Sequence, residues 1–323
     1  MPNEFAKGRR TSLFAIFAAL VVAMLFSPMA DAQAQTPDTF AKLQTTLDQI
    51  VATFSGQASV EFRDLSSDEV VAYSNSADMP AASTIKIPVM VEVFRQIAAG
   101  ELHLRDQVQL RSDDKDKGSG MLAYMKSGSK YSIQYLLTVM ITVSDNTATN
   151  MLIRVAGLDN INNTMESLGL THTKLADFVH TDTVTGDVRL LRSSAEDMTT
   201  LLTMMYKGTL VDSASSSAML DILSKQKHNG LIPRPLPKGL RIAHKTGTLN
   251  DTLNDVGIVF VKQHPYVLAV MTTGLSKGER AELIHNISRA VYVSETASAP
   301  TTVDKSRPKL HSASRETVRV ARR

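Results

Sequence analysis

A serine and a lysine stand three residues apart in the segment AASTIKIPVM, residues 81–90. Side chains three or four positions apart lie on one face of a helix, so Ser83 and Lys86 would be neighbours if this segment is helical. A serine hydroxyl is a weak nucleophile until a neighbouring base takes its proton, and a lysine can be that base when burial lowers its pKa. The pair is therefore a candidate nucleophile and base.

Pro88 separates this copy of the pattern from the others. Ser-x-x-Lys recurs three times, at Ser127/Lys130, Ser224/Lys227 and Ser306/Lys309. Proline is tolerated in the first turn of a helix and disrupts its interior, so Pro88 and the apolar residues after it predict a helix that begins close to Ser83. The hydroxyl would then lie at the positive end of the helix dipole. An N-cap serine followed by a solvated lysine is the alternative.

Two further polar groups fall where other expected elements end. Ser144-Asp145-Asn146 lies at the junction of two helical patterns, where its side chains could reach into a cleft or simply cap the second helix. Lys245-Thr246-Gly247 lies at the end of a strand pattern. A glycine at a strand edge lets another segment or a ligand approach the backbone closely, although the group could also be a plain strand-end turn.

Apolar periodicity predicts the elements that would position these groups. A helix is expected over residues 39–54, a two-stranded hairpin over 57–74, helices from 84 to about 219, strands within 239–273 and a last helix over 277–293. This order predicts an α/β fold of the α+β type: an antiparallel sheet built from both ends of the domain, covered by the first and last helices, beside an all-helical lobe. A cleft between the lobes is where a site is expected.

The two ends of the chain differ from its middle. A basic head, the apolar run 13–26 and small residues around position 30 predict a secretory signal peptide over residues 1–34, and hence a periplasmic or secreted protein. A retained anchor is the alternative, and Arg9-Arg10 leaves the twin-arginine route open beside the general one. Residues 296–323 are rich in Ser, Thr, Pro and basic residues, which predicts a disordered tail after a domain over 35–295.

Charge and composition exclude several functions. The formal net charge of +3 comes from the ends, because residues 35–295 alone carry −3, so the domain has no basic field of the kind that binds nucleic acid. The chain has no cysteine, which excludes disulfides, thiol catalysis and cysteine-ligated metals. The eight histidines show no metal-binding spacing. We therefore expect no cofactor and no metal.

The three groups occur in the order and spacing of the motifs that mark the penicillin-recognising serine enzymes: Ser83-x-x-Lys86, Ser144-Asp145-Asn146 and Lys245-Thr246-Gly247. The chain resembles the class A β-lactamases most, also in segments such as GSGML and IPRPLPKGLRIAHKTGT, over roughly residues 39–293. The resemblance implies a five-stranded antiparallel sheet with a helical lobe. It also implies hydrolysis of the β-lactam amide through an acyl-enzyme.

The resemblance assigns catalytic roles to four side chains. Ser83 would attack a β-lactam or peptide carbonyl, and Lys86 would take part in its deprotonation. Ser144 would relay a proton to the leaving nitrogen, and Lys245 would be the fourth catalytic residue.

Substrate binding is implied for the remaining motif residues. Asn146 would hold the amide side chain of the substrate, and Thr246, with Lys245, would bind its carboxylate. Gly247 would border the substrate, and the backbone N–H groups of Ser83 and Thr248 would form the oxyanion hole.

One element of the class A pattern is absent. Class A β-lactamases have Glu-x-x-Leu-Asn between the second and third motifs, and that glutamate activates the water that releases the acyl group. Here the corresponding stretch, THTKLADFVHTDTVTGDVRLLRSSAEDM, contains no such motif and has Val179 or His180 near the expected position. The candidate substitutes are Asp177, His180, Asp182 and Asp187, of which we favour Asp182.

Three interpretations follow. The first is an exported class A-type β-lactamase, and the second is a penicillin-binding-like D,D-peptidase or broad serine hydrolase with slow deacylation. The third is a non-catalytic cell-wall protein that keeps the fold, although survival of all the motif residues speaks against it. We expect a small-molecule β-lactam or peptidoglycan-peptide-like substrate, no nucleic acid, contact with a membrane only during export, and a monomer.

Overall fold

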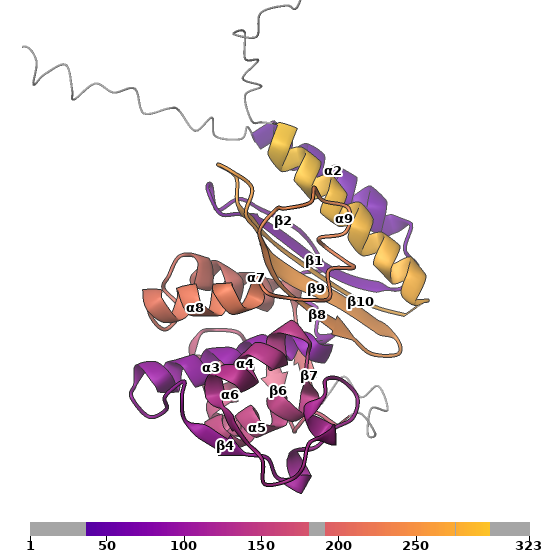
Figure 1. Ribbon diagram of the computed structural model, residues 1–323. Coiled ribbons are helices and arrows are strands. Elements are labelled where there is room, and N and C mark those ends of the chain that lie inside the picture. Colours follow the sequence, from indigo (N-terminus) through magenta and orange to yellow (C-terminus); the bar gives the residue numbers. More distant parts are fainter. Residues whose placement is uncertain (1–36, 181–190, 275, 298–323) are drawn as a thin grey trace, which may run out of the picture.

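The structure is a computed structural model that describes residues 37–180, 191–274 and 276–297. Figure 1 shows a sheet with two long helices on one face and a helix-rich lobe below it. The expected signal peptide and nearly all of the expected tail lie outside the described residues, so both stay predictions. None of the described helices is long and apolar enough to cross a membrane.

The central sheet has five antiparallel strands in the order β2-β1-β10-β9-β8. They are β1 (Gln57–Asp64), β2 (Val70–Tyr73), β8 (Ile242–Thr248), β9 (Thr252–Val259) and β10 (Tyr266–Thr273). The strands from the two ends of the domain meet at β1 and β10, which pair in register from Gln57 opposite Thr273 to Asp64 opposite Tyr266. The predicted sheet is confirmed.

The first and last helices cover one face of this sheet, as predicted. Helices α2 (Pro37–Ala52) and α9 (Lys277–Ala297) lie side by side above it in Figure 1. Alternate strand residues point to this face, so Phe62 of β1 packs with Phe40 of α2 and Tyr266 of β10. The last helix is longer than its sequence pattern indicates, and it takes in Thr296 and Ala297 from the expected tail.

The second lobe is predominantly helical. It contains α3 (Lys86–Ala98), α4 (Ile133–Thr142), α5 (Asn146–Ala156), α6 (Leu158–Ser167), α7 (Ala195–Tyr206) and α8 (Ser213–Leu223). Short turns of 3-10 helix are η1 (Ala82–Ile85), η2 (Ser112–Asp114) and η3 (Leu122–Tyr124).

The prediction of an all-helical lobe was wrong in one respect, because two small sheets belong to this region. They pair β4 (Gln107–Gln109) with β5 (Lys130–Ser132), and β7 (Leu191–Ser193) with both β3 (Met79–Pro80) and β6 (Lys174–Leu175). Strands of two or three residues contain too little alternation to be seen in the sequence.

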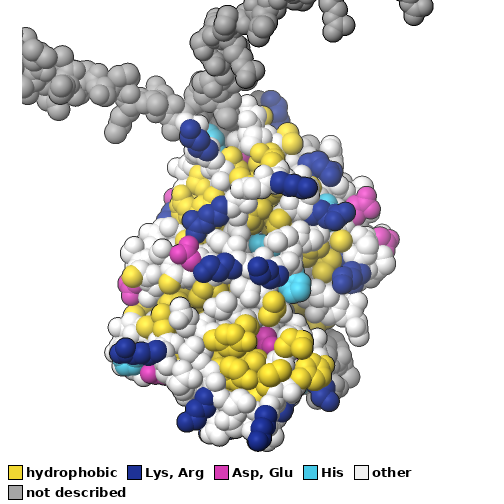
Figure 2. Space-filling model, viewed as in Figure 1, with side chains coloured by type: hydrophobic (Ala, Val, Ile, Leu, Met, Phe, Trp, Pro, Cys, Tyr) yellow, Lys and Arg dark blue, Asp and Glu magenta, His cyan; other side chains and the backbone are white. Residues whose placement is uncertain are grey.

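The two lobes share one hydrophobic core. The inner face of the sheet, including Ala243, Val256 and Met271, packs in the same buried cluster as the helices of the lobe. Close packing transmits displacements between neighbouring elements, so residues at the boundary hold fixed positions relative to one another. Figure 2 shows Lys and Arg side chains spread over the visible face among acidic and hydrophobic ones, with no single basic patch.

Candidate active site

The turn that carries Ser83 leads directly into a helix. Ala82 has a φ of +47°, in the left-handed region that few non-glycine residues adopt, and η1 then runs into α3 at Lys86. Pro88 lies in the first turn of α3, as predicted, so the helix begins where its sequence indicates. Backbone strain of this kind persists only where the surroundings enforce it.

Strands β8 and β9 enforce that conformation. The Asn254 amide of β9 donates to the carbonyls of Pro80 (2.7 Å) and Ala81 (3.1 Å), immediately before the turn. Gly247 of β8 lies so close that a Cβ there would stand 2.9 Å from the Ala81 carbonyl oxygen and 3.2 Å from the Ser83 nitrogen. The glycine therefore permits the close approach that the sequence predicted at this strand edge.

Lys86 is fully buried and points toward the junction of α4 and α5. Its Nζ donates to the Ser144 carbonyl (2.6 Å), to Ser144 Oγ (3.0 Å) and to Asn146 Oδ1 (2.6 Å). Burial, with the nearby charge of Lys245, lowers the pKa of Lys86 well below its usual value, although Asp145 and Asp116 oppose the shift. Such a lysine is suited to accept a proton.

In the Ser144-Asp145-Asn146 group, one residue has a structural role and two belong to the site. Ser144 has a φ of +59°, and its hydroxyl and carbonyl both face Lys86. Asp145 caps α5 by accepting from the Ala148 N–H (2.8 Å), and its other oxygen accepts from the Met121 N–H (2.7 Å). The capping alternative is therefore correct for Asp145, whereas Ser144 and Asn146 line the cleft.

Lys245 approaches the same hydroxyl from the sheet. Its Nζ donates to Ser144 Oγ (3.1 Å) and to the Thr246 carbonyl (2.7 Å). Burial lowers the pKa of Lys245 to about 7, and Asp255 opposes this shift. The two buried lysines thus meet at one acceptor, and each makes the charged form of the other less favourable.

These residues surround a pocket of about 640 Å³. The motif residues that line it are Ser83, Lys86, Ser144, Asn146, Thr246 and Thr248. Lys277, His180 and His228 add nitrogen-bearing side chains to the wall, and none of the described lining residues is an aspartate or a glutamate. The pocket is therefore suited to a ligand with negative charge.

The segment that replaces the class A glutamate forms part of the wall. Asn150 of α5 accepts from the Val179 N–H (2.8 Å) and donates to the Val179 carbonyl (2.9 Å), which fixes that backbone beside the pocket. His180 lines the pocket as well, whereas Asp177 is exposed and accepts from the N–H of Phe178. Asp182 and Asp187 lie outside the described residues.

Sequence reasoning did not single out Asn150 or Asn254, although both position the site. Each is a buried amide at a core position of its element. A polar residue within an apolar pattern is the sequence feature that could have pointed to them, because buried polar side chains are usually hydrogen-bonded. His244 faces away from Lys245, as its strand position predicts, and bonds to Asp255 (2.8 Å) and Asn229 (3.0 Å).

Comparisons with known proteins show the family of this chain. The sequence pattern of the β-lactamase enzyme family matches residues 42–294. The chain is 23% identical over 245 residues to β-lactamase BRO-1 of Moraxella catarrhalis, covering 69% of this chain and 75% of that protein. It is 21% identical over 253 residues to β-lactamase VEB-1 of Pseudomonas aeruginosa, covering 74% and 83%.

Some solved structures are more similar in sequence. PBP-A superimposes with a TM-score of 0.75 at 31% identity over 79% of this chain and 96% of PBP-A. A point variant of PBP-A has been solved as an acyl-enzyme complex with penicillin G, with a TM-score of 0.74. A β-lactamase from Sphaerobacter thermophilus superimposes with a TM-score of 0.73 at 30% identity, over 80% of this chain and 98% of that one.

The contact at Gly247 leads to a first prediction. Gly247→Ala should slow labelling of Ser83 by a fluorescent penicillin roughly 100-fold, because the added methyl group displaces the turn that carries the nucleophile. Gly278→Ala is the matched control, since the nearest atom to its added Cβ is 3.8 Å away. Labelling of Gly247→Ala at the wild-type rate, in protein with an unchanged circular dichroism spectrum, would contradict this role.

The pKa of Lys245 leads to a second prediction. A lysine with a pKa of about 7 is charged below that pH and neutral above it, so its attraction for a substrate carboxylate weakens as the pH rises. The second-order rate constant for penicillin labelling reports the free protein and should decline with a midpoint near pH 7. Lys245→Arg keeps its charge and should lose this decline; an unchanged midpoint in that variant would refute the assignment.

Proposed function

We propose that this chain, which belongs to the β-lactamase enzyme family, is an exported serine hydrolase that opens the β-lactam amide through an acyl-enzyme on Ser83. The observation that carries the proposal is the meeting of Lys86 and Lys245 at Ser144 Oγ, at 3.0 and 3.1 Å, in the pocket that Ser83 also lines. A nucleophile, a buried base of lowered pKa and a hydroxyl that can relay a proton are components of acyl transfer, and the second lysine adds a binding group for a carboxylate.

Acylation forms one bond and breaks another. Ser83 Oγ attacks the carbonyl carbon of the lactam, and its proton passes to the neutral amine of Lys86. The C–N bond of the lactam then breaks, and the leaving nitrogen takes a proton from Ser144 Oγ. Ser144 regains a proton from Lys86, which returns to its neutral form, so the protons balance.

Binding precedes this chemistry. Lys245 and Thr246 attract the substrate carboxylate, and Asn146 binds the amide side chain while its own Nδ2 donates to Asp116 (2.7 Å). The backbone N–H groups of Ser83 and Thr248 stabilise the charge that develops on the carbonyl oxygen. Gly247 adjoins them and leaves room for the substrate and for the turn.

A D,D-peptidase-like enzyme that β-lactams acylate and that deacylates slowly is the second candidate. It is favoured by the lack of any acidic side chain among the described lining residues of the pocket. Likeness to PBP-A, a variant of which holds penicillin G as an acyl-enzyme, is consistent with it. Release of the acyl group needs a base for water, and His180 or Asp182 is the residue that would supply one.

Export remains part of the proposal. The basic head, apolar run and small residues over 1–34 support cleavage near residue 34, which gives a periplasmic or secreted protein, and we propose that it acts as a monomer. The basic residues after 297 would remain on the mature protein, where they could contact acidic cell-wall polymer or lipid. The intact mass measured in the next experiment also reports whether residues 1–34 have been removed.

The third prediction separates the candidates. Purified protein is mixed with a fluorescent penicillin and then with a chromogenic cephalosporin, and mass and colour are followed over time. We expect one adduct per chain; rapid colour identifies a lactamase, and a persistent adduct without colour identifies the peptidase-like enzyme. If neither an adduct nor a coloured product forms, the result would favour a non-catalytic protein. Adduct formation by Ser83→Ala would disprove the nucleophile.

The fourth prediction concerns deacylation. Val179 lines the pocket where a class A glutamate is expected, so Val179→Glu should accelerate release of the penicilloyl group at least roughly 10-fold, as a general base does. Ala176→Glu adds the same charge at an exposed position and should leave the rate unchanged. Asp182→Asn with unaltered hydrolysis would remove Asp182 as the native base. Equal rates in Val179→Glu and the wild type would show that the native loop already activates water.

A further inference from the structure

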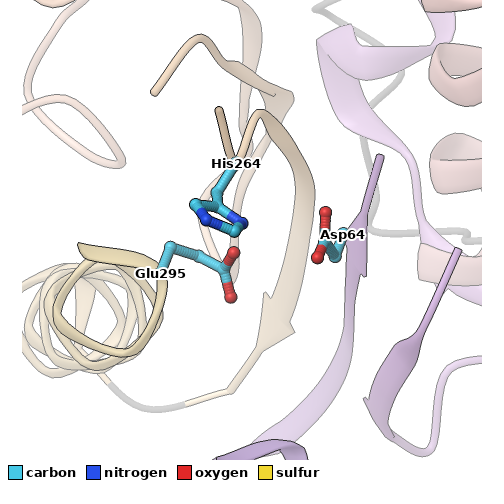
Figure 3. Close-up of side chains that lie close together, drawn as sticks. All are labelled: Asp64, His264 and Glu295. Atoms are coloured by element: carbon cyan, nitrogen blue, oxygen red, sulfur yellow. The ribbon is translucent and has the colours of Figure 1, made fainter. Parts of the chain in front are cut away.

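Three ionisable side chains converge at a distance from the pocket. Asp64, His264 and Glu295 each offer one ligand atom, and these atoms lie within 4.8 Å of one another. Their exposed fractions are 1%, 5% and 0%, so the cluster is sealed from solvent. Figure 3 shows the side chains pointing toward one another from a strand, a turn and a helix.

The cluster joins distant segments of the chain. Asp64 ends β1, His264 lies between β9 and β10, and Glu295 belongs to the last turn of α9. Asp64 pairs with Tyr266, at the end of the sheet opposite the β8–β9 turn that follows Thr248. The cluster therefore takes no part in the pocket chemistry.

Two polar atoms of this region lack a partner. Among the described residues, His264 Nδ1 and the Tyr266 hydroxyl are buried and have no hydrogen-bond partner. Burial and the charge of Glu295 raise the pKa of Tyr266 well above its usual value, which places an anionic group beside that hydroxyl. A buried nitrogen without a partner is unusual in folded proteins and calls for an explanation such as an ion.

Part of the cluster has a role of its own. Asp64 accepts hydrogen bonds from the Ser66 N–H (2.7 Å) and the Ser67 hydroxyl (3.0 Å), and so shapes the turn after β1. These bonds leave acceptor positions on both carboxylate oxygens, because an ionised carboxylate has about four. The turn therefore accounts for Asp64, whereas the buried Nδ1 of His264 has no hydrogen-bond partner among the described residues.

We propose that Asp64, His264 and Glu295 bind one divalent transition-metal ion, represented by Zn²⁺, that fastens the C-terminal helix to the sheet. Three atoms no more than 4.8 Å apart share a point at most about 2.8 Å from each, and small side-chain shifts bring them to the ~2.0–2.2 Å of zinc bonds. An imidazole nitrogen with two carboxylates suits such an ion, and its charge balances two buried anions.

A metal ion at this site would link distant segments of the chain, as a disulfide does in other proteins. The chain has no cysteine, and the last turn of α9 lies near the strand ends of β1 and β10, where Glu295 meets Asp64 and His264. An ion that binds only the folded state stabilises that state by mass action. The site is structural, so occupancy should change stability and leave penicillin labelling at Ser83 unaltered well below the melting temperature.

The test uses the full mature protein, purified without a histidine tag and stripped with a chelator. Native mass spectrometry should show one Zn²⁺ per chain at slight excess, and the melting temperature should rise by roughly 5 °C at 100 times the dissociation constant. Absence of stoichiometric binding, or binding without a rise in melting temperature, would overturn the proposal.

Variants locate the ion. Glu295→Gln and His264→Gln should lose both the bound Zn²⁺ and the rise in melting temperature, whereas His103→Gln removes an exposed histidine elsewhere and should keep both. X-ray absorption of the wild-type zinc protein provides a test that needs no variant, and should show one imidazole among oxygen ligands. Ligation by more than one imidazole, or retained binding in folded Glu295→Gln, would refute this site and indicate surface histidines.

Discussion

Two buried lysines that share one hydroxyl determine how the rest of this structure is arranged. Lys86 comes from the helical lobe and Lys245 from the sheet, and each reaches Ser144 Oγ with its full length buried. Burial makes the protonated form of each amine unfavourable, and a charge on one disfavours a charge on the other. Burying the two amines side by side therefore costs free energy of folding. The hydrophobic core that the two lobes share offsets this cost.

The residues around this pair show how the cost is met. Asn254 and Gly247 fix the turn of Ser83 from the sheet side, and Asp145 anchors the loop over the pocket from the lobe side. Two non-glycine residues, Ala82 and Ser144, hold a positive φ at the points where chemistry is expected. Strain at both positions is a sign of preorganisation, because a relaxed backbone would move the Ser144 hydroxyl away from the lysines and Ser83 away from its place in the pocket wall.

Much of this could be predicted from the sequence, for physical reasons. The sheet, its two covering helices and the start of α3 follow from periodicity and from Pro88, which are local properties. The small sheets of the lobe have strands too short for any period, and the extension of α9 to Ala297 has little apolar signal. The clamp of Asn150 on Val179 and the grouping of Asp64 with His264 depend on contacts between distant segments, which no local pattern encodes. The motif residues converge as expected, while their catalytic roles remain predictions.

The pairing of β1 with β10 determines the stage of synthesis and folding at which the complete site can form. The centre of the sheet can close only when residues 57–64 pair with residues 266–273, and the β8–β9 hairpin that carries Lys245 is joined to β1 only through β10. Contacts of such sequence separation form late and slowly, because the intervening chain must first be brought together. A nascent chain therefore carries Ser83 and Lys86 through most of synthesis without Lys245, and the complete site forms only with the completed sheet.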